Sequence, residues 1–92
     1  SVMLRSNTMA KINAELEQQI RSMPDQLFNL IVRTYGDAAP HLEWCREVDV
    51  AIKQQFRLSP ALAVTCSGAV AVLLLEQEWV KSIELDQTVR TM

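Results

Sequence analysis

Residues 59–75 read SPALAVTCSGAVAVLLL and contain no charged side chain. The segments on either side mix charged and apolar residues. A helix that is apolar on every side has to be surrounded by protein or lipid. The apolar part, residues 60–75, is shorter than the roughly 20 residues that a helix needs to span a bilayer. We therefore expect a buried core helix and no membrane span, with a membrane-associated helical protein as an alternative.

Ser67 and Gly68 are the weak point of this stretch, because glycine costs about 1 kcal/mol in a helix interior. Either one helix runs from residue 60 to residue 85, or a short helix ends near Cys66 and a second begins at Ser67. We favour the continuous helix, in which Gly68 would allow another helix to approach closely. A strand at 69–75 is a third option, but helices elsewhere would offer it no partner strand.

The N-terminal segment has the pattern of an amphipathic helix that begins with Ser6 or Asn7 as its cap. Glu17 and Arg21 stand four residues apart, in the order that stabilises a helix. Apolar residues recur at spacings of three and four and predict one narrow apolar face. These residues are Met9, Ile12, Leu16, Ile20 and Met23.

Two further helices are predicted, over residues 24–35 and 39–57. Ser22 and Asp25 have the spacing of a helix-capping pair, and Gly36 is a natural stop. With short connections between them, these segments predict an all-α fold, a small four-helix bundle-like domain with a central, largely buried C-terminal helix. We expect residues 1–92 to form a single domain with flexible ends at 1–6 and 87–92.

Composition favours a protein that binds other proteins. The chain has 92 residues, of which 49% are hydrophobic, and a domain this small buries only roughly 60–65% of its surface. We therefore expect a protein partner, in a homo-oligomer or a hetero-complex. The net charge is −2 and the aromatic content is 5%, so neither a phosphate-binding stripe nor a base-stacking surface is expected. Two cysteines and no signal peptide favour a cytoplasmic protein.

Catalytic and metal-binding patterns were sought and not found. His41 and Cys45 lie four residues apart and Cys66 could approach them, but a structural zinc site needs a fourth ligand. The residues around Ser67 do not form a nucleophile elbow, and two glycines are too few for a phosphate-binding loop. We therefore expect no enzyme activity, no cofactor and no metal.

A small helical DNA-binding regulator is the other alternative, since a helix–turn–helix could be centred on residue 67. Its recognition helix, residues 69–75, would have no side chain able to hydrogen-bond a base edge or a phosphate.

An interaction or assembly module (an adaptor, an oligomerisation domain or a chaperone-like protein) that acts through apolar helix faces is therefore the preferred function. Tryptophan is enriched at binding hot spots, which makes Trp79 the first anchor candidate and Trp44 the second. The candidate interface residues are Met9, Ile12, Leu16, Ile20, Trp44, Gly68, Trp79 and Ile83.

Overall fold

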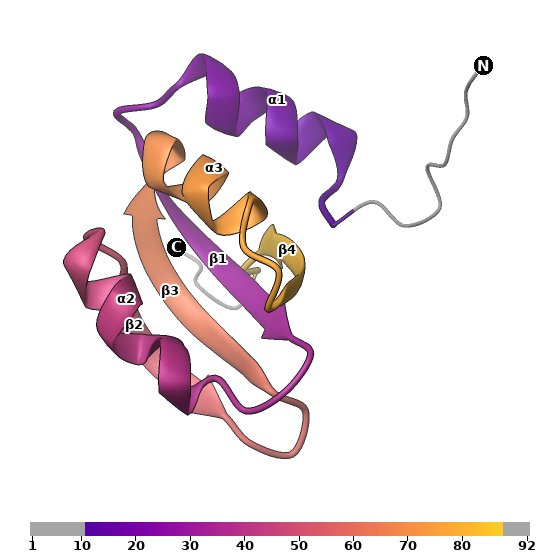
Figure 1. Cartoon of the computed structure of the whole chain (residues 1–92). Coiled ribbons are helices and arrows are strands. Elements are labelled where there is room, and N and C mark those ends of the chain that lie inside the picture. The colour runs from indigo at the N-terminus through magenta and orange to yellow at the C-terminus, as the bar shows by residue number, and fades with distance from the viewer. Residues whose placement is uncertain (1–10, 88–92) are drawn as a thin grey trace.

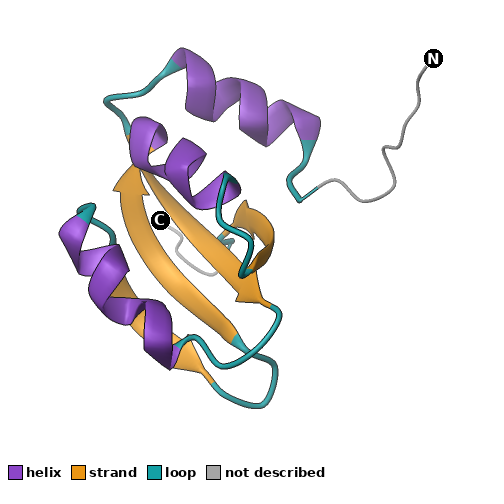
Figure 2. Ribbon diagram, viewed as in Figure 1, coloured by secondary structure: helices purple, strands orange, loops and turns teal. Residues whose placement is uncertain are grey.

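The computed structural model describes residues 11–87 and has an α+β fold, so the expected all-α bundle is wrong. Helices lie between strands along the chain except between β2 and β3, which follow one another, and the helices lie together on one side of a sheet (Figure 1, Figure 2). The elements are α1 (Ala14–Ser22), β1 (Leu27–Thr34), the 3₁₀ turn η3 (Ala39–His41), α2 (Leu42–Glu47), β2 (Ala51–Phe56), β3 (Ala61–Ser67), α3 (Gly68–Leu75) and β4 (Val80–Leu85).

The four strands form one antiparallel sheet in the order β2-β3-β1-β4. β1 pairs with β3 from Leu27↔Ser67 to Arg33↔Ala61, and β4 pairs with the other side of β1. α2 connects β1 to β2, and α3 connects β3 to β4. This is the β-α-β-β-α-β, ferredoxin-like topology, preceded here by the additional helix α1.

β1 occupies most of the segment that was predicted to be a helix over residues 24–35. Its burial alternates along the strand, and Phe28, Leu30, Val32 and Thr34 point into the core. The side chains between them face the other way, as period-two geometry requires. Ile31 is one of these, and an apolar residue on the outward face conceals the alternation that indicates a strand.

The continuous helix predicted over residues 60–85 is also wrong. The chain changes from strand β3 to helix α3 at Ser67, which is the break considered as the alternative, although the element before it is a strand. The side chain of Ser67 accepts a hydrogen bond from the backbone N–H of Val70 at 3.3 Å and so caps α3. Residues 69–75, considered as a strand, are helical, and the chain then turns into β4.

The helix predicted over 39–57 ends much earlier, at Glu47. Asp49 has a φ of 69°, the left-handed conformation with which helices often end. The N–H of Val50 donates to the carbonyl of Cys45 at 2.8 Å and closes this turn. The chain is therefore redirected into β2, which pairs with β3.

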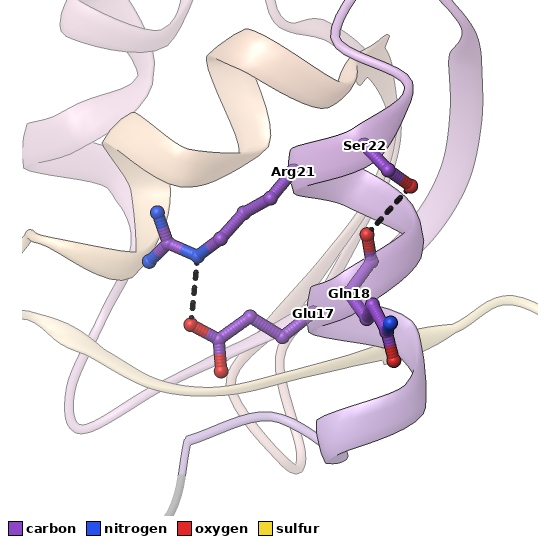
Figure 3. Close-up of polar contacts among 4 residues, drawn as sticks. All are labelled: Glu17, Gln18, Arg21 and Ser22. Atoms are coloured by element: carbon purple, nitrogen blue, oxygen red, sulfur yellow. Dashed lines mark hydrogen bonds and ion pairs between the residues drawn. The ribbon is translucent and has the colours of Figure 1, made fainter.

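α1 is the one predicted N-terminal helix that forms, although it starts at Ala14 and is capped by Asn13. The expected caps at residues 6 and 7 lie outside the described residues. The Arg21 Nε donates to the Glu17 carboxylate at 2.9 Å, which confirms the predicted pair (Figure 3). Ser22 ends this helix instead of starting another, and its hydroxyl donates to the carbonyl of Gln18 at 2.8 Å (Figure 3).

The core lies between the sheet and the helical layer. α1 packs beside α3 with Leu16 and Ile20 buried, and Gly68 begins α3 at this crossing. A Cβ on Gly68 would clash with the carbonyl oxygen of Ile20 and stand 2.6 Å from that of Met23. Gly68 therefore allows the close approach that was predicted for it.

Candidate interaction surface on the open sheet face

One face of the sheet is covered by helices, and no described element among residues 11–87 covers the other, which we call the open face. Strand registry places the outward residues of neighbouring strands side by side: Asn29 opposite Thr65, and Ile31 between Ala63 and Glu84. Registry also sets Phe56 beside Ala61. The open face therefore combines apolar and polar side chains contributed by all four strands.

The open face is hollowed along β3. Ala61 and Ala63 form the floor of this hollow and are 1% and 6% exposed, because larger side chains rise on both sides of them. One wall consists of Phe56 with the turn after it, and the other includes Ile31. The hollow has a volume of about 670 Å³. It exists because the side chains on β3 are small and lie between larger side chains on β1 and β2.

The rim of the hollow is polar and carries both signs of charge. Arg33 donates from Nε to Glu84 at 2.7 Å, and Asp86 lies at the same rim. Towards the other end of β3, the Thr65 hydroxyl donates to Asn29 Oδ1 at 2.7 Å. This mixture of charges is unlike the basic surface that binds nucleic-acid phosphates.

Both edges of the sheet are protected, unlike its open face. β2 carries a register shift between Ile52 and Gln54, beside the exposed Lys53. Bulges and lysines on edge strands discourage pairing with another strand. At the opposite edge, Ile12 bridges Ile83, whose N–H donates to the carbonyl of Lys11 at 2.8 Å. A partner would therefore find the open face more accessible than either edge.

The predicted apolar stripe is used within the chain, although only Leu16 and Ile20 lie on α1: Ile12 precedes the helix and bridges Ile83, and Met23 after it is 37% exposed. Ile12, Leu16 and Ile20 are 8%, 7% and 0% exposed, and Ile83 of β4 is 2% exposed. All four belong to the core cluster. Met9, the remaining member of the stripe among the candidates, lies outside the described residues. Gly68 contacts the backbone of α1, as described above.

The two tryptophans chosen as anchors lie together. The ring of His41 stacks on that of Trp79, with centroids 4.2 Å apart and planes within 4°. Trp44 meets Trp79 edge to face at 5.8 Å. All three side chains are half-buried. Their contacts link η3, α2 and the segment before β4. This cluster lies on the core side of the sheet, away from the hollow.

Neither cysteine is arranged for chemistry. Cys45 and Cys66 are free and buried, and burial raises the pKa of both thiols, that of Cys66 to about 11. Among residues 11–87, no three His, Cys, Asp or Glu side chains are grouped so that they could hold a metal ion. Within the same residues, no helix has the length and apolar character needed to cross a membrane.

Comparison with known proteins gives no family: no protein-family model and no curated protein matches this chain. The candidate surface therefore rests on its own geometry. Its central residues, Ile31, Phe56, Ala61 and Ala63, were not among the sequence candidates. The small residues at 61, 63, 65 and 67 alternate with Leu62, Val64 and Cys66, and that period of two was the signal that could have identified them.

Proposed function

We propose that this protein is an interaction module that binds another protein through its open sheet face. The single observation that carries this proposal is the hollow along β3, with its apolar floor and its mixed polar rim. A predominantly apolar, concave surface with a few polar groups is typical of binding sites. The proposal moves the interaction from the helix faces, which are packed within the chain, to the sheet.

An amphipathic α-helix of the partner is the proposed occupant. The backbones of β1 and β2 stand two strand spacings apart, which is roughly 10 Å. Because a helix with its side chains is about 10–12 Å wide, it would rest on the walls, on Ile31 and Phe56, and not between them. The hollow above Ala61 and Ala63 would then receive apolar side chains of that helix. Arg33 and Glu84, both exposed at the rim, could pair with polar groups that flank the apolar stripe of such a helix.

The proposal has two further parts, the location of the protein and its role. A reducing, cytoplasmic location is supported by two free thiols. An adaptor or chaperone-like role would use the same surface, because each requires a protein partner to be held without chemistry.

Photo-crosslinking tests the proposal. p-Benzoylphenylalanine replaces Phe56, which is 37% exposed at the hollow, or Leu73, which is 40% exposed on α3 as a control. Both proteins are irradiated in an extract of the source cells, and the cross-linked peptide of the product is mapped. We expect position 56 alone to give a product whose cross-link lies in an apolar helical segment of another protein.

A charge placed in the floor provides the matched test. Ala63→Arg should abolish the product, whereas Ala69→Arg, at an exposed position of α3, should leave it unchanged. Circular dichroism checks that both variants are folded. The proposal is overturned by a product that survives Ala63→Arg, by a cross-link to an extended segment, by a product of two copies of this chain, or by no product from position 56.

A further inference from the structure

The turn between β2 and β3 extends the open face at one end of the hollow. Leu58 at its tip is 104% exposed, and a single exposed leucine is ordinary on a protein surface. Leu58, however, lines the hollow together with Phe56 and Arg57, so it continues an apolar surface. The arginine beside it makes no ion pair with any residue between 11 and 87.

The turn is held in place by the sheet. The N–H of Thr34 at the end of β1 donates to the carbonyl of Pro60 at 3.1 Å, and Ala61 directly after it pairs with Phe56 and Arg33. A group that is fixed before binding loses less conformational entropy when it is buried. The backbone next to Leu58 is therefore held by the hydrogen bonds of the sheet, although the side chain of Leu58 itself is fully exposed.

The size of the sheet face indicates that a partner needs more than the hollow. Four strands about 4.8 Å apart and about 20 Å long give the face a projected area of roughly 400 Å², and the hollow occupies only part of it. A stable protein interface buries about 800 Å² on each partner. The turn is the apolar surface that is continuous with the hollow, and it is the natural source of the missing area.

We infer that Arg57 and Leu58 form a second anchor for the same partner, which presents an apolar pocket for Leu58 beside a carboxylate for Arg57. This inference rests on the proposed function, because it assumes that the open face is occupied. Leu58 would exchange full exposure for burial, and Arg57 would gain the ion pair that it lacks within residues 11–87. The charge of Arg57 would fix the position of the partner along the groove, because complementary charges set the register of an interface.

A competition experiment tests the second anchor. The photo-reactive protein with the probe at position 56 is irradiated in the source-cell extract together with increasing amounts of unlabelled competitor. Leu58→Ser should raise the half-inhibitory concentration about tenfold relative to the natural chain, since loss of an anchor costs at least that much. Arg57→Glu should raise the half-inhibitory concentration further than Arg57→Gln, because glutamate would repel the partner's carboxylate whereas glutamine only removes the attraction.

Matched controls are available on the helical side of the molecule. Leu73→Ser and Arg46→Glu change exposed residues of α3 and α2 and should compete as well as the natural chain. If Leu58→Ser and Arg57→Glu also compete equally well while Ala63→Arg does not compete, the second anchor is refuted and the proposed function stands. If position 56 gives no product at all, both fail together.

Discussion

At the scale of single residues, the clearest electrostatic feature is the pair of buried thiols. Burial raises the pKa of Cys66 from 9.0 to about 11, and the neighbouring Cys45 acts in the same direction. Cys66 lies on the inward face of β3 and is 1% exposed. Both thiols are therefore inert in the native protein, since the thiolate is the reactive form.

This shift predicts a loss of stability at high pH. The unfolded state releases the thiol proton near pH 9, whereas the folded state keeps it until about pH 11. Between these values the unfolded state binds fewer protons, so the free energy of unfolding falls as pH rises. Urea denaturation from pH 8 to pH 11 should show an extra loss of the order of 2 kcal/mol compared with the variant that carries Cys45→Ala and Cys66→Ala. Equal slopes for the two proteins would contradict this assignment.

Single residues also explain where three of the helices begin or end. Asn13 caps α1, Ser67 caps α3 and Asp49 ends the α2 turn. Each of these is a residue whose short polar side chain suits a helix end or the left-handed conformation. Ser67 is a possible break on the sequence alone, but Asp49 falls inside the helix predicted over residues 39–57, because aspartate is also common on exposed helix faces.

At the scale of elements, the crossing of α1 and α3 is the most constrained contact. The N–H groups of Gly68 and Ala69 donate to the carbonyls of Gln26 and Pro24 at 3.0 and 3.1 Å. The Lys11 ammonium donates to the carbonyls of Leu75 and Gln77 at 2.9 and 2.7 Å. Both ends of α3 are thus held by the N-terminal part of the chain, which leaves the crossing little room to adjust.

The crossing predicts a large effect of one added methyl group. Gly68→Ala should lower the free energy of unfolding by about 1–3 kcal/mol, the usual range for overpacking, because the atoms that its Cβ would meet belong to the backbone. Gly36→Ala is the matched control, since a Cβ there meets nothing within 4 Å. Urea midpoints measure both changes. A Gly68→Ala midpoint equal to that of the natural chain would show that the helices can separate without cost.

The strands were misassigned for a reason that is specific to this sheet. An ordinary two-layer sheet has polar residues on its uncovered face, which makes the alternation visible. Here Ile31, Ala61 and Ala63 stand on that face among the polar Asn29 and Thr65, so the alternation of apolar and polar residues is interrupted in β1 and β3. Ile31, Ala61 and Ala63 also line the candidate binding hollow. Apolar residues on the outward face of the sheet therefore explain both why the strands were predicted as helices and why the hollow is apolar.

At the scale of the whole molecule, the sheet is built from segments that are far apart in the sequence. β1 pairs with β3 through contacts such as Leu30↔Val64 and with β4 through Val32↔Ile83. Bringing distant segments together costs loop-closure entropy before their contacts can stabilise the sheet, and this cost slows folding. The topology therefore sets the folding rate as well as the shape.

Refolding should consequently take milliseconds to seconds, in contrast to the microseconds open to the fastest small helical bundles. Stopped-flow dilution from urea can follow it through the fluorescence of Trp44 and Trp79, which meet only when η3, α2 and the segment before β4 are assembled. Completion within microseconds, in a temperature-jump experiment, would indicate that local contacts dominate and would contradict the sheet as the rate-limiting structure.

By itself, the sequence determined some local features: the Glu17–Arg21 pair, the helix that carries Leu16 and Ile20, and the need for small size at Gly68. It offered the break at Ser67 only as an alternative to a continuous helix. These local features depend on neighbours within a few residues. Only the tertiary structure decided that residues 27–34 and 61–67 are strands and that Ala61 and Ala63 form the floor of a hollow. The physical reason is that a strand gains its hydrogen bonds from another part of the chain, so its identity and its exposed face exist only once that partner is in place.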